Sequence, residues 1–427
     1  MEAIILLLVF IAAIVLGVPI SWCIGLVTIL TIHFSGAKLT ILPTKMITGI
    51  DSFTYLCIPF FILAADIMSK GGLTKKILEF CDALVGHIRG GLAHANVLAS
   101  MLFGGISGAA TADVAGLGSI EIEMMTEQGY DTEFSAAVTA ASAVLSPIVP
   151  PSNIFIIYAV AAGNVSVSAM FLGGIIPALI LTVGMLAMNY YFAVKRNYPS
   201  RPSFAGWRAV GRTAWKSLPA LIMPIIILGG ILTGIFTPTE SSVVAVAYAI
   251  IVSMLGPQKL TSKELFRSFI NSAKMTSVVM IIIAMAAGMG WGITAMQLPQ
   301  TISKWCLSFA TTQNQFLLVS FILLMIVGML MDVAPAILIM APILLPAAKL
   351  FGVDMLRFGL CLSIGLTIGL ITPPVGMLLF TTSTVAKIDL SRMYKAIIPY
   401  AVLELVIAFI IFFIEPVTVF IPRLFGY

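Results

Sequence analysis

The stretch Leu145–Asn153, LSPIVPPSN, places two adjacent prolines inside a long apolar segment, and Leu370–Gly376, LITPPVG, does so again later in the chain. Proline has no amide hydrogen, so two carbonyls before each pair lose their usual helical partners. These are the carbonyls of Ser146, Pro147, Gly369 and Leu370. In hydrocarbon an unpaired carbonyl is costly, so such a break persists only where protein, an ion or cavity water satisfies it. The first break and the second break therefore predict a binding site at mid-membrane depth.

The composition identifies the class of protein. The 427 residues are 60% hydrophobic and 10% charged, and the mean hydropathy is +1.11. Soluble domains carry about 25% charged residues, so the chain is predicted to be an all-α polytopic membrane protein in a lipid bilayer. The net charge of +5 is small and dispersed, which argues against a nucleic-acid partner. The five cysteines and three histidines are scattered and form no metal or disulfide motif.

Apolar segments of membrane-spanning length recur along the chain. They lie at about 3–33, 45–68, 131–163, 168–194, 218–236, 239–256, 276–298, 356–386 and 396–422. The first is read as a retained span, because it is too long for a signal peptide and lacks a cleavage signature. Two further apolar regions, 91–125 and 314–350, have Gly, Pro or a carboxylate in the middle. They are predicted to be re-entrant hairpins, with a single kinked span in each as the alternative.

Loop charge favours the hairpins. The linker 195–217 holds six Lys or Arg residues and no acid, so it is predicted to be cytoplasmic. With both hairpins re-entrant, the other basic loops, 69–90, 257–275 and 387–395, fall on the same side. The N-terminus is then cytoplasmic, the C-terminus lies on the opposite side, and the two hairpins enter from opposite faces.

The chain also shows signs of an internal duplication. A shift of 223 residues places Gly105 on Gly328, Asp131 on Asp354, and one proline pair on the other. A hairpin followed by a Pro-Pro-broken helix therefore occurs twice with opposite orientation, which is the inverted-topology repeat of secondary transporters. The predicted parts are scaffold helices and a cytoplasmic linker (1–90), transport repeat 1 (91–194), a basic amphipathic linker (195–217), scaffold helices (218–313), transport repeat 2 (314–395) and a C-terminal helix (396–427).

Each hairpin tip is predicted to meet the break that follows it. The first tip, Gly104–Asp113, combines small residues with hydroxyls, and the second tip, Gly328–Pro335, is less polar. Neutral oxygens of unwound backbone suit Na⁺, and helix N-termini suit an anionic substrate. The predicted substrate-binding residues are Ser107, Thr111, Ser152, Asn153 and Gly376. The predicted Na⁺ ligands are Gly105, Ser107, Ser146, Pro150, Asn153, Gly328, Asp332, Gly369 and Thr372, in two sites.

The alternative for both tips is close helix packing, with the hydroxyls bonded back to the carbonyl four residues earlier. Four carboxylates, Asp66, Asp113, Asp332 and Glu404, lie in or near apolar segments and are candidates for function. Asp113 and Asp332 could take part in ion coupling or cap the second half of each hairpin. Asp66 and Glu404 are expected to snorkel or to pair locally.

Five motifs carry a resemblance to one family. They are GGISGAATADVAGLG (104–118), SPIVPPSN (146–153), GIFTPTESS (234–242), GMLMDVAPAILIMAPILLP (328–346) and GLITPPVGMLLF (369–380). The chain resembles the large membrane subunit of tripartite ATP-independent periplasmic (TRAP) transporters, over essentially its whole length. This resemblance implies a Na⁺-driven elevator in the bacterial inner membrane, with two sodium sites, substrate between them and no organic cofactor.

The resemblance also implies partners and a class of substrate. A periplasmic substrate-binding protein would deliver an organic acid, and a small four-helix membrane subunit would be a separate chain. The family handles C4-dicarboxylates, sialic acids, other sugar acids and keto acids. Two other functions are considered. One is a proton-coupled organic-anion transporter that uses Asp113 and Asp332. The other is an intramembrane serine protease, suggested by the short motif Gly105–Gly108, GISG.

Overall fold

The computed structural model describes residues 2–200, 203–255, 259–298, 300–301 and 310–427, without the side chains of residues 2–4, 7, 15, 106 and 107. All secondary-structure elements in this part of the chain are helices. Eight of them are long and apolar enough to cross a membrane, which confirms the all-α multi-pass class.

The N-terminal region is more broken than the apolar pattern predicts. Its helices are α1 (Glu2–Val15), α2 (Ile20–Phe34), α3 (Ile41–Ile50), η1 (Phe53–Leu56), α4 (Cys57–Lys70) and α5 (Leu73–Val85). The single spans expected at 3–33 and 45–68 are wrong, because the chain turns between α1 and α2 and again between α3 and η1. Gly17 has a φ of +77°, which only glycine adopts readily, and Pro19 precedes α2 without an amide hydrogen. This first turn is apolar, so hydropathy alone does not reveal it.

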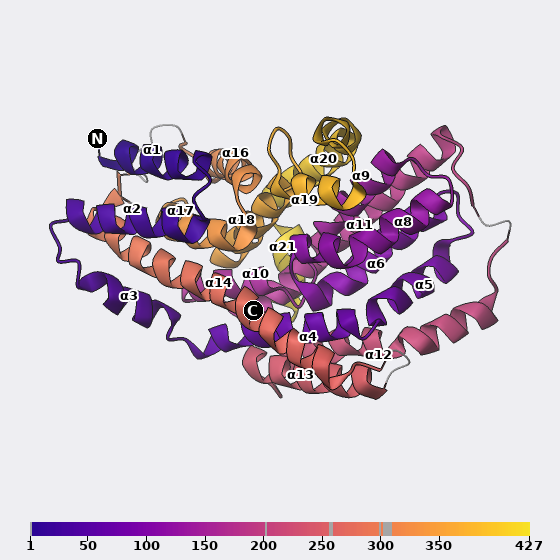
Figure 1. The fold of residues 1–427 in the computed structure, drawn as a ribbon. Coiled ribbons are helices and arrows are strands. Elements are labelled where there is room, and N and C mark those ends of the chain that lie inside the picture. Colours follow the sequence, from indigo (N-terminus) through magenta and orange to yellow (C-terminus); the bar gives the residue numbers. More distant parts are fainter. Residues whose placement is uncertain (1, 201–202, 256–258, 299, 302–309) are drawn as a thin grey trace.

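Three long helices line one side of the molecule. They are α12 (Trp207–Leu232), α13 (Pro238–Leu255) and α14 (Ser262–Ala295). α13 and α14 pack against α4, and α14 also packs against α2 and α3; α14 crosses Figure 1 diagonally. The basic amphipathic segment expected before residue 218 is continuous with the following span, because α12 runs without interruption from Trp207. Trp207 and Trp215 are exposed on this helix, as interfacial anchors would be.

Both predicted hairpins are present as pairs of packed arms. In the first, α6 (Gly91–Ser107) is followed by α7 (Ala110–Asp113), a π-helical turn η2 (Val114–Gly118) and α8 (Ser119–Glu127). In the second, α16 (Gln313–Leu330) is followed by α17 (Val333–Leu350). The side-chain nitrogen of Asn96 in α6 lies 4.0 Å from the sulfur of Met125 in α8, and the ring of Phe316 in α16 stacks at 4.9 Å on that of Phe351, just after α17. Each pair of arms therefore folds back on itself, as a single kinked span would not.

Both predicted broken helices are interrupted at the prolines. The first consists of α9 (Thr132–Ala143) and α10 (Asn153–Ala162), and the second of α18 (Met355–Gly369) and α19 (Met377–Ala386). The Pro150–Pro151 and Pro373–Pro374 peptide bonds are cis. Three further helices, α11 (Val167–Lys195), α20 (Leu390–Phe413) and α21 (Pro416–Leu424), complete the described fold.

The two halves of the chain match in helix position and in packing. The helices α16, α18, α19 and α20 begin 222 to 224 residues after α6, α9, α10 and α11. In the first half α6 packs on α9, and in the second half α16 packs on α18. Each half also reaches into the other, because α10 packs on α17 while α19 packs on η2 and α8.

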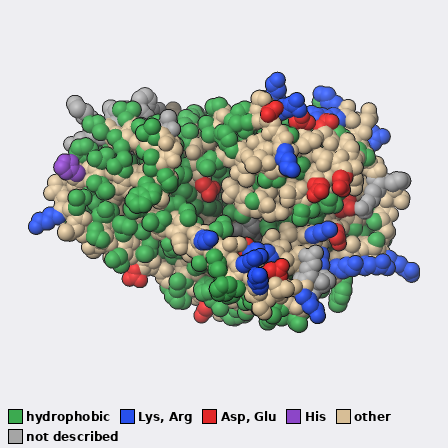
Figure 2. Space-filling view, in the orientation of Figure 1, with side chains coloured by type: hydrophobic (Ala, Val, Ile, Leu, Met, Phe, Trp, Pro, Cys, Tyr) green, Lys and Arg blue, Asp and Glu red, His purple; other side chains and the backbone are tan. Residues whose placement is uncertain are grey.

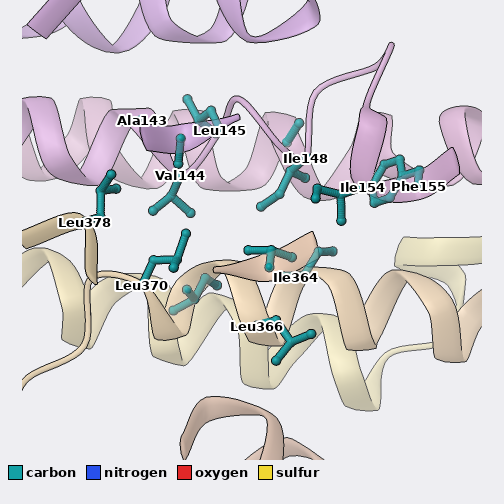
Figure 3. Close-up of a cluster of buried hydrophobic side chains, with 14 of the residues drawn as sticks. Ala143, Val144, Leu145, Ile148, Ile154, Phe155, Ile364, Leu366, Leu370 and Leu378 are labelled. Carbon is teal, nitrogen blue, oxygen red and sulfur yellow. The ribbon is translucent and has the colours of Figure 1, made fainter. Parts of the chain in front are cut away.

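The two broken helices lie against each other in opposite directions. α9 contacts α19, and α10 contacts α18, so the half before one break meets the half after the other. In Figure 3, Val144 and Ile148 point toward Leu370 and Ile364 across a layer of buried apolar side chains. This layer holds the two breaks at the centre of the core.

Charged side chains are few on much of the face of the molecule drawn in Figure 2. Figure 2 shows Lys and Arg mainly in the right half of the view, the part of the molecule where Figure 1 places α5, α12 and the loop end of α11. Hydrophobic side chains cover most of the left half of the same face. A surface in contact with lipid tails has this composition.

Candidate functional site

The first hairpin tip is pressed directly against the first break. A Cβ atom on Gly104 would lie 2.7 Å from the Cα atom of Ser146, and one on Gly105 would lie 2.8 Å from the carbonyl oxygen of Pro150. Gly108, with a φ of +64°, lies against Asn153 in the same way. Four residues predicted to form one cation site, Gly105, Ser146, Pro150 and Asn153, are therefore gathered in one place. The side chain of Ser107 lies outside the described part of the structure.

Protein groups satisfy a carbonyl that the first break frees. The Ser152 hydroxyl donates to the carbonyl of Pro147 at 2.5 Å and accepts from the amide of Phe155 at 3.3 Å. Ser152 is thus the N-cap of α10, and it is fully buried. Since both hydrogen-bonding functions of its hydroxyl are used locally, Ser152 stabilises the break and does not face the cavity described below.

The second tip meets the second break through backbone alone. A Cβ atom on Gly328 would lie 2.3 Å from the carbonyl oxygen of Leu366, and one on Gly369 would lie 2.7 Å from the Cα atom of Gly328. The amide of Gly376, a residue with a φ of +59°, donates to the carbonyl of Met329 at 3.1 Å. Gly376 therefore links the second break to the second tip and lies away from the cavity.

The carbonyls expected to be free at the second break are also partnered. The carbonyl of Gly369 accepts from the amide of Thr372 at 3.0 Å, and that of Leu370 accepts from the amide of Leu378 at 3.1 Å. The Thr372 hydroxyl donates to the carbonyl of Ile368 at 3.0 Å. Of the three partners expected for the freed carbonyls, protein groups satisfy those of Gly369, Leu370 and Pro147, because turns and caps replace the helical donors. Each carbonyl keeps a second lone pair, and the Thr372 oxygen can still accept.

One cavity of about 420 Å³ lies between both tips and the long helices α4 and α14. From the tips and the first break it is lined by Gly108–Ala112, Asn153 and Asp332–Ala334. From the other side it is lined by Asp66 and Ser69 of α4 and by Met275 and Val279 of α14. Of the predicted site residues, Thr111, Asn153 and Asp332 face this cavity. The wall formed by α4 and α14 was not predicted, because it is far from both breaks along the chain.

Three helices start at the cavity. The second arm of the first hairpin begins at Ala110, α10 begins at Asn153, and α17 begins at Val333. Helix N-termini carry unpaired amide hydrogens and a partial positive charge, so they favour an anion. The cavity also offers the hydroxyls of Thr111 and Ser69 and the side-chain amide of Asn153. This arrangement suits a small organic anion that also carries hydrogen-bonding groups.

Buried polar side chains fill the first hairpin. Ser146 donates to Asp113 at 2.8 Å, Ser142 donates to Asn96 at 2.7 Å, and Asn96 donates to Thr139 at 2.8 Å. The other carboxylate oxygen of Asp113 has no hydrogen-bond partner among the described residues. Asn96, Thr139 and Ser142 are not among the residues predicted to form the site.

The second hairpin has no counterpart of this network. At the 223-residue offset, Asn96, Asp113, Glu121, Thr139, Ser142 and Ser146 correspond to Val319, Ala336, Leu344, Leu362, Gly365 and Gly369. The second hairpin therefore folds back on itself without a polar interior of this kind. The two tip-and-break pairs are chemically unequal, the first rich in side-chain oxygens and the second built from backbone.

The remaining carboxylates behave differently from one another. Asp332 accepts from the amide of Val333 at 2.8 Å and caps α17. Asp66 pairs with Lys70, so its expected local pairing is confirmed. Glu404 was expected to snorkel or pair locally, and this expectation is wrong. Its side chain is fully buried in α20, and neither carboxylate oxygen has a partner among the described residues.

The geometry does not support a serine protease. Ser107 and His94 lie at opposite ends of α6, about 20 Å apart along the helix axis. His33 and His87 are exposed outside the hairpin, whereas a base must reach its nucleophile by a hydrogen bond. Among the described residues, no cluster of His, Cys, Asp and Glu could hold a metal ion in their place.

Comparison with known proteins gives one consistent result. The family described as "Tripartite ATP-independent periplasmic transporter, DctM component" matches residues 7–417. The chain is 37% identical over 404 residues to the C4-dicarboxylate TRAP transporter large permease protein DctM of Pseudomonas aeruginosa, covering 94% of this chain and 93% of that protein. It is 35% identical over 388 residues to the sialic acid TRAP transporter large permease protein SiaM of Vibrio cholerae, covering 90% of each.

A third relative and a solved structure agree with this. The 2,3-diketo-L-gulonate TRAP transporter large permease protein YiaN of Escherichia coli is 35% identical over 410 residues, and the match covers 96% of each chain. The crystal structure of the Alcanivorax borkumensis YdaH transporter has the same fold, with a TM-score of 0.64 at 15% identity. The match covers 88% of this chain and 87% of that one.

Proposed function

Because the chain belongs to the DctM component family of tripartite ATP-independent periplasmic transporters, and is therefore a transporter and not an enzyme, we propose that it carries out Na⁺-coupled uptake of a small organic acid. The observation that carries this proposal is the cavity between the two tips and the α4–α14 wall. It combines three helix N-termini with hydroxyl and amide side chains. Those groups favour one carboxylate together with polar substituents.

The names of the relatives support an organic anion as substrate. Sialic acid, C4-dicarboxylates and 2,3-diketo-L-gulonate are all carboxylates. In the cavity, Thr111 and Asn153 would hydrogen-bond the substrate, and the amides at the start of α10 would face its carboxylate, since Asp332 already accepts from the first amide of α17. Ser152 and Gly376 would act indirectly, by holding the breaks in shape.

Two cation sites are proposed where the tips meet the breaks. The first would use backbone oxygens of Gly105 and Pro150 with side-chain oxygens of Ser107, Ser146 and Asn153. The second would use backbone oxygens of Gly328 and Gly369 with the Thr372 hydroxyl and, nearby, Asp332. Close backbone packing at Gly105 and Gly328 supports both, since it brings carbonyls of two segments together without intervening side chains. Na⁺ bound there would draw each tip onto its break and complete the cavity.

The transport step is proposed to be an elevator movement. The hairpins and broken helices would move as one body along the wall formed by α4, α13 and α14. The cavity supports this separation into a moving body and a wall, because one of its sides comes from the hairpins and the first broken helix and the other from α4 and α14. We further propose that the two hairpin-and-broken-helix halves, residues 91–194 and 314–395, form inverted repeats in the bacterial inner membrane, with the N-terminus cytoplasmic and the C-terminus periplasmic. A small four-helix membrane subunit and a periplasmic substrate-binding protein would complete the transporter.

Uptake into proteoliposomes tests the proposal. The chain is reconstituted with its small membrane subunit, and the binding protein is supplied outside, loaded with radiolabelled sialic acid, succinate or 2,3-diketo-L-gulonate. We expect uptake of one of these acids only with an inward Na⁺ gradient and only with the binding protein. Uptake driven by a proton gradient in the absence of Na⁺ would overturn the coupling and favour a proton-coupled transporter.

A further inference from the structure

The cavity has negative side chains but no positive one on its surface. Its described lining includes the carboxylates of Asp66 and Asp332 and no Lys or Arg. An organic anion that enters would meet these two charges in a partly enclosed, low-dielectric space, where repulsion between like charges is strong. The helix N-termini offset part of that repulsion at the inner end of the cavity. Asp66, on the opposite wall, needs a separate partner.

Lys70 is that partner, and it joins two helices at the edge of the cavity. Its Nζ atom lies 2.7 Å from Oδ2 of Asp66, one helical turn earlier in α4. The same atom donates to the hydroxyl of Ser268 in α14 at 3.1 Å. An ammonium group has three hydrogens, so one remains for a further acceptor. Its two partners keep the charge next to the cavity.

The pair lies at the solvent-accessible end of the α4 face that lines the cavity. The α4 residues that line the cavity, from Ile58 through Ile62 and Asp66 to Ser69, follow one face of the helix. Lys70 is the last residue of α4, and its side chain is 30% exposed, while that of Asp66 is 25% exposed. One end of this wall is thus buried and apolar, and the other carries an ion pair that solvent reaches.

We propose that Lys70, at the end of α4 that adjoins the predicted cytoplasmic loop 69–90, binds the substrate carboxylate as the anion leaves the cavity, with Asp66 as the partner that it exchanges. The substrate carboxylate and the Asp66 carboxylate are the same chemical group, so Lys70 trades one ion pair for an equivalent one as the anion passes. When the site is empty, Asp66 holds Lys70 in place and lowers its affinity for unrelated anions. This inference rests on the proposed function in one respect, that the substrate is a carboxylate.

The plainer role is an ordinary salt bridge four residues apart on a helix, which would only support α4. The two roles predict different behaviour of the two partners. If the ion pair is only structural, neutralising either side chain breaks it and has the same effect on anion affinity. An exchange site loses the anion only when Lys70 is neutralised, because neutral Asn at position 66 removes a competitor.

The experiment measures anion binding and does not depend on coupling or on the binding protein. The permease and its small membrane subunit are purified in detergent with Na⁺. Thermal stabilisation is then titrated with sialic acid, succinate or 2,3-diketo-L-gulonate. We expect Lys70→Gln to weaken the apparent affinity for the anion at least tenfold and Lys70→Arg to keep it within about threefold of the wild-type value. Asp66→Asn should bind the anion as tightly as wild type or more tightly. Lys75→Gln, an equal loss of charge at an exposed position in α5, is the control.

The unfolding temperature without ligand shows whether each variant is folded. Equal weakening by Lys70→Gln and Asp66→Asn would overturn the inference, as would wild-type affinity in Lys70→Gln. Failure of Na⁺-driven uptake would contradict the proposed function instead, because the binding titration involves no gradient. The two failures are therefore distinguishable.

Discussion

Replacing Gly328 with alanine is expected to separate the second tip from the second break. The added Cβ would lie 2.3 Å from the carbonyl oxygen of Leu366 and 2.9 Å from its Cα atom. Ordinary contacts of a Cβ atom begin at about 3.4 Å, so α16 and α18 must move apart by about 1 Å. The obstacle is backbone inside a buried helix and cannot turn aside as a flexible side chain would.

Two magnitudes follow from that displacement. Overpacking a well-packed core costs about 1–3 kcal/mol, and a backbone obstacle places Gly328→Ala near the upper end. If Gly328 and Gly369 supply oxygens to one Na⁺, a shift of about 1 Å also weakens Na⁺ activation, since misplacement on that scale can cost up to about a hundredfold. We expect a lower unfolding temperature and a half-saturating Na⁺ concentration raised at least tenfold.

The assay needs a glycine control. Gly229 lies inside α12, and a Cβ on it would meet nothing within 4 Å. Gly229→Ala is expected to be neutral or stabilising by up to about 1 kcal/mol, the helix-propensity gain. Thermal unfolding in detergent and Na⁺ titration of uptake are measured for both variants. Indistinguishable behaviour of the two would refute the close packing at Gly328 and the second cation site built on it.

Three further predictions use the same preparations. Ser146→Ala should lower the free energy of unfolding by about 1–3 kcal/mol, because it leaves the buried Asp113 oxygen without its 2.8 Å donor. Ser135→Ala, which loses only a bond to a backbone carbonyl at 3.0 Å, should lower it less. Equal unfolding temperatures of the two variants would contradict this reasoning. Tyr400→Phe should lower the unfolding temperature, since it leaves the buried side-chain oxygen of Asn189 without its hydroxyl donor; an unchanged temperature would show that this bond contributes nothing. Replacing Na⁺ by choline should abolish uptake. It should also remove about 2.7 kcal/mol of stabilisation per site if Na⁺ was present at a hundredfold excess over its Kd. An unfolding temperature that does not depend on Na⁺ would argue against resident cation sites.

Local chemistry explains why so much of this fold can be predicted. A missing amide hydrogen at Pro150 and Pro373 interrupts a helix whatever surrounds it. Long apolar runs identify membrane helices by length alone. Glycine and carboxylates in the middle of two such runs indicate hairpins, and both hairpins are present. The single spans expected at 3–33 and 45–68 are both broken in the structure, the first of them at a turn that is itself apolar.

The composition of the site depends on contacts between segments that lie far apart in the sequence. The membrane class, the two breaks, the hairpins and the family can be predicted from the sequence, because each depends on neighbouring residues or on motifs within one segment. Tertiary packing is needed to show that α4 and α14 form the far wall of the cavity, that Lys70 reaches Ser268, and that the broken helices cross in opposite directions. It also decided that Ser152 and Leu378 satisfy carbonyls that the prolines free. These are contacts between separate segments, and the packing of the whole chain selects them from many that the local sequence would allow.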